Sequence, residues 1–380
     1  MRLVYVIKSL GNSAGMERVL CSKANYLAEV VGYQIFIITE LPLSQDFFFN
    51  YSPAINIESL GLIEHSGNRF KKIILHPVFK FKFRRRLSKR IYSIKPDITI
   101  SMFGEELSFL PRLRDGSLKI AEFHYSRNYL IHLIRCMPNL HLRWIRLLRA
   151  SIFQFTQRVF AAKYKKVVLL TEKDRQLWGK KQNLVVIPNP LSFQTDKKSA
   201  LENKKIIAVG RLIAQKGFDL LIEAFSKIAK KFPEWNLLII GEGQDEAFLL
   251  GLINHKGLKD RVTISPPRKN IQDILMDSSI YALSSRYEGF GLVLTEAMEC
   301  GVPCVAFDCE CGPSEIINNN IDGFLVEDGN VIQFAEKLEI LMSDNELRKR
   351  MGVQAKQNVK RFGIEKVMQH WTSLFDDLTA

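Results

Sequence analysis

Short apolar strands, glycine-containing loops and amphipathic helices alternate along most of the chain, and this alternation constrains the fold more than any other feature. Residues 2–8 form a predicted strand, Gly11 and Gly15 lie in the loop that follows, and residues 17–30 have the pattern of a helix. A polar stretch at 192–205 interrupts the alternation, which then starts again with a second series of strands and helices. Strands that alternate with helices predict parallel sheets covered by helices on both faces.

The expected fold class is therefore α/β, with two Rossmann-like, doubly wound parallel-sheet domains. At 380 residues the chain is longer than one hydrophobic core usually supports. We place an N-terminal domain at residues 1–190 and a C-terminal domain at 191–362. The remaining segment, 363–380, has the pattern of an amphipathic helix beyond any strand, and we expect it to pack back on the N-terminal domain.

The net charge of +14 is concentrated in the first half of the chain. Residues 1–190 contain 31 Lys or Arg against 13 Asp or Glu, a balance of +18, whereas residues 191–380 contain 23 against 27, a balance of −4. Between His65 and Pro96 there are eleven basic residues and no acidic one. Such a field attracts an anionic surface, either lipid headgroups or nucleic acid, although many charge runs are only solvated surface.

The sequence predicts neither a membrane span nor a zinc site. No apolar run approaches the roughly 18 residues that cross a bilayer, and the apolar start at residues 3–7 is too short for a signal peptide, so we expect a cytoplasmic protein. The six cysteines, of which only the last four cluster, lack the paired Cys-x-x-Cys spacing of a zinc site. We interpret them as reduced structural thiols.

A glycine-rich turn that leads directly into a helix, at residues 285–298, is the most informative segment. The free N–H groups and the positive dipole end of such a helix face the strand ends, where they would stabilise a diphosphate. Glu288 precedes the helix and Glu296 lies one turn inside it, so one carboxylate would accept hydrogen bonds from ribose hydroxyls and the other from sugar hydroxyls. Either glutamate alone would fit a common helix cap.

A second strand-to-helix loop, at residues 209–218, carries Arg211 and Lys216. It delivers two cations to the same strand-end edge as the glutamates, where they would stabilise phosphate charge that builds on a leaving group. In isolation the two side chains would also fit solvated loop cations.

The loop with Arg211 and Lys216, followed by Glu288 and Glu296, resembles the signature of the family 4 glycosyltransferases, which have the GT-B fold. The resemblance covers residues 206–326 and is looser in the N-terminal half. It implies two Rossmann-like domains that face a cleft, with the acceptor bound by the N-terminal domain and a nucleotide sugar by the C-terminal one. It also implies transfer with retained anomeric configuration.

The resemblance assigns roles to individual residues. Arg211 and Lys216 would bind the donor diphosphate. Glu296 would bind the ribose and Glu288 the transferred sugar, while backbone N–H groups of residues 290–293 would hold phosphate and sugar. The implied donor-binding residues are Gly15, Arg211, Lys216, Arg268, Phe290, Gly291, Leu292, Val293 and Glu296, and the implied catalytic residues are Glu288 and His124.

Three of these positions lie in less regular loops. His124 ends a predicted strand and resembles the family's cleft histidine near the reacting sugar, although a lone histidine is more often structural. Gly15 lies in a loop like the family's, in which Ala14 replaces the first of the usual two glycines. Arg268 follows two prolines in the loop where the family's backbone, usually with a glycine, meets the nucleotide base.

The chain contains no Asp-x-Asp pair, which a metal-dependent transferase of the other major fold would use to hold a divalent ion. We therefore expect no metal and no other cofactor, with cationic side chains and helix N-termini acting on the diphosphate instead. The expected donor is a nucleoside diphosphate sugar, with UDP chosen from its frequency in the family. As the family implies, the acceptor hydroxyl attacks from the face of the leaving group and gives its proton to a leaving-phosphate oxygen, without a side-chain nucleophile.

The expected acceptor is a hydroxyl of a glycan or of a polyprenyl-linked molecule in cell-surface polysaccharide or glycolipid assembly. A predicted helix at 140–159 has one apolar face and, opposite it, Arg143, Arg146 and Arg149, which suits an anionic membrane surface and equally a core helix. The protein would then lie peripherally at the inner face of the membrane.

Two alternatives to a glycosyltransferase stay open at this point. A nucleotide-sugar epimerase or a phosphorylase can use the same fold. A nucleic-acid-binding protein could use the basic half, but the basic runs contain no recognition motif and we expect no nucleic-acid partner.

Overall fold

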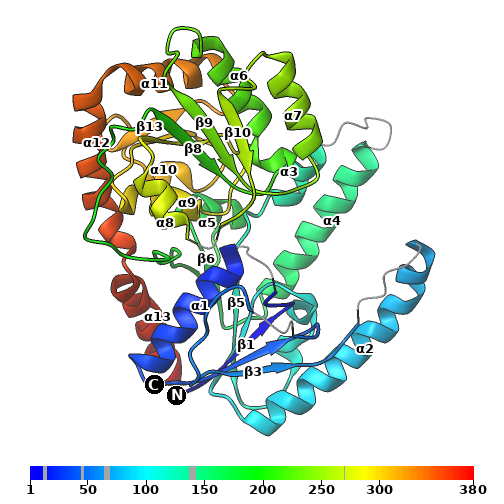
Figure 1. Cartoon of the computed structure of the whole chain (residues 1–380). Helices are drawn as coiled ribbons and strands as arrows, with labels where there is room; N and C mark the ends of the chain where they lie inside the picture. The colour runs from blue at the N-terminus through cyan, green and yellow to red at the C-terminus, as the bar shows by residue number, and fades with distance from the viewer. Residues whose placement is uncertain (12–14, 44–46, 64–68, 137–142, 269) are drawn as a thin grey trace.

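Two parallel sheets, one from each half of the chain, are each covered by helices on both faces (Figure 1). This arrangement confirms the expected α/β fold with two Rossmann-like units. The computed structural model describes residues 1–11, 15–43, 47–63, 69–136, 143–268 and 270–380.

The first sheet, within the described residues, has the strand order β3-β2-β1-β4-β5-β6-β7. Its pairings are parallel, and Tyr5 lies opposite Ile37 on one side and Ile100 on the other. The order reverses between β1 and β4, so the carboxyl ends of these two strands flank a crevice. The strands are β1 (Arg2–Ile7), β2 (Gln34–Thr39), β3 (Asn56–Ser59), β4 (Ile98–Ser101), β5 (Leu118–Glu122), β6 (Lys166–Leu169) and β7 (Leu184–Val186).

The second sheet repeats this plan with the order β10-β9-β8-β11-β12-β13 among the residues that the structure describes. The reversal here lies between β8 and β11, and strands such as β11 and β12 are buried along their whole length because helices cover both faces. The strands are β8 (Lys205–Val209), β9 (Asn236–Ile240), β10 (Val262–Ser265), β11 (Ile280–Leu283), β12 (Cys304–Phe307) and β13 (Gly323–Val326).

Most of the basic run in the first half forms one long helix, α2 (Arg69–Ile94), which the sequence pattern did not predict. Phe83, Leu87 and Ile91 are fully buried at a spacing of four residues, so one side of the helix packs on the sheet while cations occupy the other sides. The other helices of this half are α1 (Gly15–Glu29), α3 (Tyr129–Arg135), α4 (Arg143–Ala161) and α5 (Glu172–Trp178), with 3₁₀ turns η1 (Glu105–Ser108) and η2 (Leu110–Arg112).

Helix α4 corresponds to the helix predicted at 140–159. It begins at Arg143, and the earlier residues of the predicted helix lie outside the described part of the chain. Its residues Trp144 and Phe155 are 68% and 66% exposed, so the side chains assigned to the apolar face are not core residues. The helices of the second half are α6 (Phe218–Ile228), α7 (Glu246–His255), α8 (Ile271–Met276), α9 (Leu292–Glu299), α10 (Pro313–Ile316), α11 (Val331–Ser343) and α12 (Asn345–Asn358), with 3₁₀ turns η3 (Ala214–Lys216) and η4 (Val359–Phe362).

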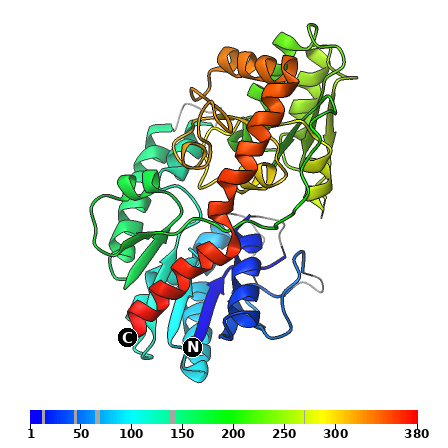
Figure 2. The same ribbon diagram turned by 90° about the vertical axis from the view of Figure 1, so that its left-hand side faces the viewer.

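The last helix, α13 (Ile364–Thr379), leaves the second half and packs against α1 in the first half (Figure 2). Trp371 and Phe375 are buried in the same core cluster as Leu20 and Leu27 of α1. The chain therefore passes between the two halves twice. The two passages lie side by side, because the backbone N–H of Leu191 donates to the carbonyl of Phe362 at 2.8 Å.

Within its described residues, the structure has no helix that is both long enough and apolar enough to cross a membrane. The six cysteines are free thiols, and five of them are buried, including Cys300 and Cys304. Burial raises the pKa of the Cys300 thiol to about 12, against the opposing charge of Lys356, so this thiol stays protonated.

Candidate active site

Two loops of the second sheet meet where its strand order reverses. The loop after β8 carries Lys216, and the loop after β11 carries Glu288. The hydroxyl of Ser284 donates to the carbonyl of Lys216 at 2.9 Å. Gly217 has a φ of +61°, and a Cβ at this position would lie 2.0 Å from the carbonyl oxygen of Ser284. Only glycine fits there, so the two loops are packed against each other.

The first pair that the structure brings together is Lys216 and Glu288, both of which the sequence placed at the donor site. Lys216 Nζ lies 2.7 Å from Glu288 Oε1, and the Glu288 side chain is 8% exposed. An ammonium has three N–H donors, so Lys216 can bind a phosphate oxygen and still hold the glutamate. The pair therefore offers one cation to a leaving group and one oriented carboxylate beside it.

The second predicted carboxylate, Glu296 on α9, is 1% exposed. Its Oε1 accepts a hydrogen bond from the guanidinium of Arg18 on α1, which lies 278 residues away in the sequence. Its Oε2 is buried without a hydrogen-bond partner in the described part of the structure. A buried carboxylate oxygen without a partner is costly, so this atom is suited to accept a hydrogen bond from a ligand hydroxyl.

The amino ends of α1 and α9 lie beside each other. Helix α1 begins at Gly15 and α9 begins at Leu292, and a Cβ on Gly15 would lie 2.9 Å from Leu292 Cδ1. Both helices thus present their free N–H groups and positive dipole ends at one place. Two adjacent helix N-termini favour a bound anion there, next to Arg18.

His124 lies at the carboxyl end of β5, directly under the loop that carries Glu288. A Cβ on Gly289 would lie 2.2 Å from the carbonyl oxygen of His124, so glycine permits the close approach of the two halves. The imidazole is 5% exposed, and its Nε2 lies 3.1 Å from Glu122 Oε1 without the alignment of a hydrogen bond. The structure thus joins the predicted cleft histidine to the predicted sugar-binding loop.

A buried ion pair lies behind His124. Lys23 Nζ is 2.6 Å and 2.7 Å from the two carboxylate oxygens of Glu122, and it also lies 3.7 Å from the centre of the Trp371 ring on α13. Burial alone would raise the pKa of Glu122, but the charges of Lys23 and His124 outweigh it and hold the pKa at about 2. Glu122 is therefore ionised, and it fixes the position of the imidazole from below.

The two remaining predicted cations are exposed. The charge of Arg211 acts on Tyr125 of the first half and on Tyr287 of the second, where it opposes the rise in pKa that burial causes in both phenols. Arg211 therefore lies at the cleft between the halves. Arg268 is exposed in the loop after the edge strand β10 and makes no described contact with the other site residues, so its assignment stays a prediction.

The side chain of Phe290 belongs to the core rather than to the site. It is 3% exposed, and its ring meets that of Phe362 edge-on at 5.4 Å. Any contact of Phe290 with a ligand must therefore come from its backbone, whereas Leu292 and Val293 are half-buried. Gly291, with a φ of +104°, directly precedes α9.

Acidic residues of the second half bind the first half across the cleft, a role that no sequence pattern predicted. Glu310 accepts hydrogen bonds from Asn128 at 2.8 Å and from His132 at 3.1 Å. Glu315 accepts the backbone N–H groups of Glu172 and Lys173, each at 2.7 Å, and so caps the amino end of α5. These contacts hold the two halves in their observed relative position.

Comparison with known proteins agrees with this architecture. The family model described as glycosyl transferases group 1 matches residues 192–358. An uncharacterized glycosyltransferase from Haemophilus influenzae is 30% identical over 382 residues, covering 98% of this chain and 99% of that protein. The chain belongs to the group 1 glycosyltransferases. It is thus a transferase, as the loop with Arg211 and Lys216 and the glutamates Glu288 and Glu296 predicted.

Two further comparisons place the glycosyltransferase in context. It is 32% identical over 168 residues to the N-acetylgalactosamine-N,N'-diacetylbacillosaminyl-diphospho-undecaprenol 4-alpha-N-acetylgalactosaminyltransferase of Campylobacter jejuni, covering 44% of this chain and 45% of that protein. The structure of a Staphylococcus aureus TarM mutant in complex with fondaparinux, alpha-GlcNAc-glycerol and UDP superposes with a TM-score of 0.77 at 16% identity, covering 99% of this chain and 100% of that one. This likeness confirms the GT-B fold.

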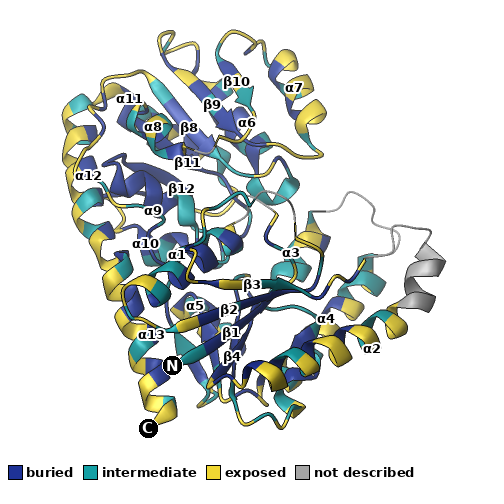
Figure 3. Ribbon diagram, turned by 60° about the horizontal axis from the view of Figure 1, so that its bottom comes forward, coloured by how far each residue is buried: buried dark blue, intermediate teal, exposed yellow. Residues whose placement is uncertain are grey.

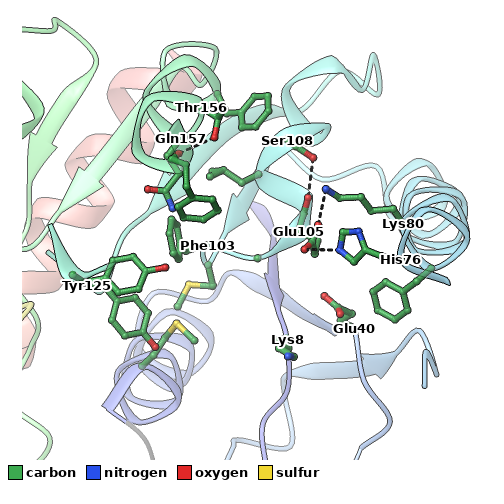
Figure 4. Close-up of a pocket in the computed structure, with 18 residues that line it drawn as sticks. Lys8, Glu40, His76, Lys80, Phe103, Glu105, Ser108, Tyr125, Thr156 and Gln157 are labelled. Atoms are coloured by element: carbon green, nitrogen blue, oxygen red, sulfur yellow. Dashed lines mark hydrogen bonds and ion pairs between the residues drawn. The ribbon is translucent and has the colours of Figure 1, made fainter. Parts of the chain in front are cut away.

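The N-terminal half of the glycosyltransferase contains a cavity of about 510 Å³ between α2, α4 and the carboxyl end of the first sheet (Figure 4). Aromatic residues line the end nearest the cleft, with Tyr125 and Tyr129 ring centres 5.3 Å apart. At the other end Glu105 is held by Lys80 at 2.9 Å and by His76 at 3.3 Å. The sequence did not predict this cavity, because its lining comes from seven separate segments and forms no local motif.

Proposed function

We propose that this protein is a retaining family 4 glycosyltransferase that moves a sugar from a nucleoside diphosphate sugar, a UDP-sugar, to an acceptor hydroxyl. The observation that carries this proposal is the buried Glu296 carboxylate. One of its oxygens is held by Arg18, and the other has no hydrogen-bond partner among the described residues and lies beside two helix N-termini. A ribose hydroxyl satisfies the free oxygen, and the diphosphate that follows the ribose occupies the positive ends of α1 and α9.

The TarM structure, a complex with UDP, supports UDP as the nucleotide of the donor. In the proposed complex Lys216 and Arg211 contact the diphosphate, and Glu288, kept in place by Lys216, accepts hydrogen bonds from the transferred sugar. The reaction follows the same-face course that the family implies, in which a leaving-phosphate oxygen takes the acceptor proton. We propose that these cations and helix ends stabilise the leaving group without a metal ion.

We propose cell-surface polysaccharide or glycolipid assembly as the setting, with a glycan or a polyprenyl-linked acceptor. The diphospho-undecaprenol named for the Campylobacter jejuni relative supports this class of acceptor. The cavity between α2 and α4 is the proposed acceptor site, because Tyr125 lines it and the charge of Arg211, at the proposed donor site, acts on the Tyr125 phenol.

We further propose that the protein works in the cytoplasm, held peripherally at the inner face of the membrane by the first half. The outer sides of α2 and α4 are largely exposed (Figure 3). They combine cations such as Arg84 and Arg149 with exposed apolar side chains such as Phe81 and Trp144. Cations attract anionic headgroups, and exposed aromatic groups enter the interface.

Thermal unfolding with a panel of nucleotide sugars tests the donor site, because a true donor stabilises the folded state by mass action. We expect UDP and a UDP-sugar to raise the Tm, and Glu296→Gln to remove most of that rise. Glu299→Gln is the matched control, since Glu299 is also buried on α9 but accepts from the Thr195 backbone at 2.8 Å, away from the proposed ribose. An equal rise in the Glu296→Gln variant contradicts the ribose assignment, and product formation without an acceptor indicates an epimerase or a phosphorylase instead.

A further inference from the structure

A second hollow extends the cavity between α2 and α4 towards the outer surface. It has a volume of about 320 Å³ and lies between α2 and the η1–η2 segment. It shares Lys80, Ser108 and Phe160 with the larger cavity, so the two form one depression. This depression runs from Tyr125, beside the donor site, to the exposed side of α2.

The lining of the outer hollow is cationic. Lys80, Arg84 and Arg112 contribute to it, and none of its described lining residues is acidic. Lys80 is paired with Glu105. Arg84 and Arg112 are exposed and form no ion pair within the described part of the chain. Two unpaired guanidinium groups beside an ammonium suit a doubly charged anion, because each guanidinium can bind two phosphate oxygens at once.

Apolar side chains surround the same cations. Phe81, Phe109 and Phe160 line the hollow, and Phe81 is 67% exposed. Beyond it, Val78 on α2 and Phe155 on α4 are 49% and 66% exposed. Exposed apolar groups at the outer rim favour an apolar chain attached to the anion, which a free phosphate ion does not have.

We propose that the outer hollow binds the diphosphate of a lipid-linked acceptor, with Lys80, Arg84 and Arg112 on its phosphate oxygens. The acceptor sugar then lies in the inner cavity against Tyr125 and Tyr129, and the lipid leaves along the exposed sides of α2 and α4. The depression presents aromatic rings, cations and apolar groups in the order in which such a molecule presents sugar, diphosphate and lipid. This inference rests on the proposed function and names the class of its acceptor.

Binding of geranyl diphosphate tests the hollow without knowledge of the acceptor sugar. Calorimetry is done with saturating UDP, so that the donor site cannot take up the diphosphate. We expect wild type to bind, and the Arg84→Gln/Arg112→Gln variant to bind at least tenfold more weakly, about 1.4 kcal/mol. The matched control is Lys82→Gln/Arg85→Gln, which removes the same charge from exposed positions of α2 outside the hollow and should bind within twofold of wild type.

Three results overturn the proposal: no binding to wild type, an equal loss in both double variants, or binding of inorganic pyrophosphate as tight as that of geranyl diphosphate. An equal loss in both double variants would mean that only the overall positive charge of α2 attracts the diphosphate. Equally tight binding of pyrophosphate would mean that the hollow binds free diphosphate rather than a lipid. The proposed function is tested separately in the same wild-type sample. If UDP does not raise the Tm, the proposed function is wrong, whatever the result with geranyl diphosphate.

Discussion

The ammonium of Lys23 and the carboxylate of Glu122 form a buried ion pair in which each side chain is 1% exposed. The pair joins α1 to the end of β5, where Glu122 also lies 3.1 Å from the His124 ring. Glu122 thus lies between a lysine of α1 and the predicted cleft histidine. Because both charges are out of water, each depends on its partner.

We expect Lys23→Met to lower the free energy of unfolding by about 3–5 kcal/mol, because it leaves the Glu122 charge buried without its partner. Lys23→Met/Glu122→Leu should recover a large part of this loss, since both charges are then removed. Urea unfolding of the two single variants and the double variant measures this coupling. Additive losses would show that the pair does not behave as a unit.

Glu288→Gln should reduce turnover about 100-fold, because the variant keeps the shape of the side chain but loses the charge that the proposed mechanism places beside the transferred sugar. The UDP-induced rise in Tm should be retained, since Lys216 stays free to bind phosphate. Steady-state kinetics separates the two effects. A change in KM alone, with kcat unaltered, would place Glu288 in binding rather than in the reaction.

Transfer should continue in the presence of EDTA if, as proposed, Arg211, Lys216 and two helix N-termini act on the leaving diphosphate. The measurement is initial rate before and after chelation, with magnesium or manganese added back. Loss of turnover that either metal restores would be incompatible with stabilisation by cationic side chains alone.

Stability should depend on pH through Asp174, a residue of α5. Burial raises its pKa to about 7, against the backbone N–H of Arg127, which donates to Asp174 Oδ1 at 2.7 Å. The folded state therefore holds a proton that the unfolded state has lost, and this group makes stability fall as pH rises from about 4 to 7. At one pKa unit per roughly 1.4 kcal/mol, the total is about 4 kcal/mol.

Asp174→Asn keeps the acceptor for Arg127 but cannot ionise, so it should be more stable than wild type at pH 8 and nearly equal to it at pH 4. Urea unfolding across this range is the measurement, with Asp260→Asn at an exposed position as the control. Parallel curves for wild type and Asp174→Asn would contradict the raised pKa.

Liposome flotation tests the membrane proposal. Wild type should float with anionic vesicles at low salt and not with neutral ones, because each Lys or Arg near an anionic surface contributes about 1 kcal/mol that salt screens. A variant in which several cations of α2 are changed to Glu should stay at the bottom. The changed residues are Lys80, Lys82, Arg84, Arg85 and Arg86. Equal flotation of this variant would show that these cations do not bind the membrane.

The sequence predicted those parts of the site that lie in continuous loops. Lys216 and Glu288 belong to strand-to-helix loops whose glycines and flanking strands make them recognisable, and the structure places these two side chains in contact. The sequence could not predict which distant residues contact these side chains. Arg18 meets Glu296 across 278 residues, and nothing in the local pattern of either segment encodes that contact.

The same limit applies to the fold. The alternation of strands and helices predicted both sheets, because each strand carries its own apolar signal. Helix α2 was missed since its charge run dominates the composition, and among its described side chains those buried in the core are Phe83, Leu87, Ile91 and Ile94. The cavity between α2 and α4 depends on how these helices pack against the first sheet, which no local pattern of the sequence encodes.

The two neighbouring passages of the chain, joined by the bond from Leu191 to Phe362, make a single pivot for the whole molecule. Rotation there changes only a few backbone dihedrals, but it must break polar contacts, such as those of Glu296 and Glu315, and also an apolar one, because Leu170 of the first half is buried in a core cluster of the second. Separation of the halves would therefore expose Leu170 as well as leave polar groups to water. Removal of α13 would therefore take away half of this pivot, along with the aromatic ring that covers Lys23.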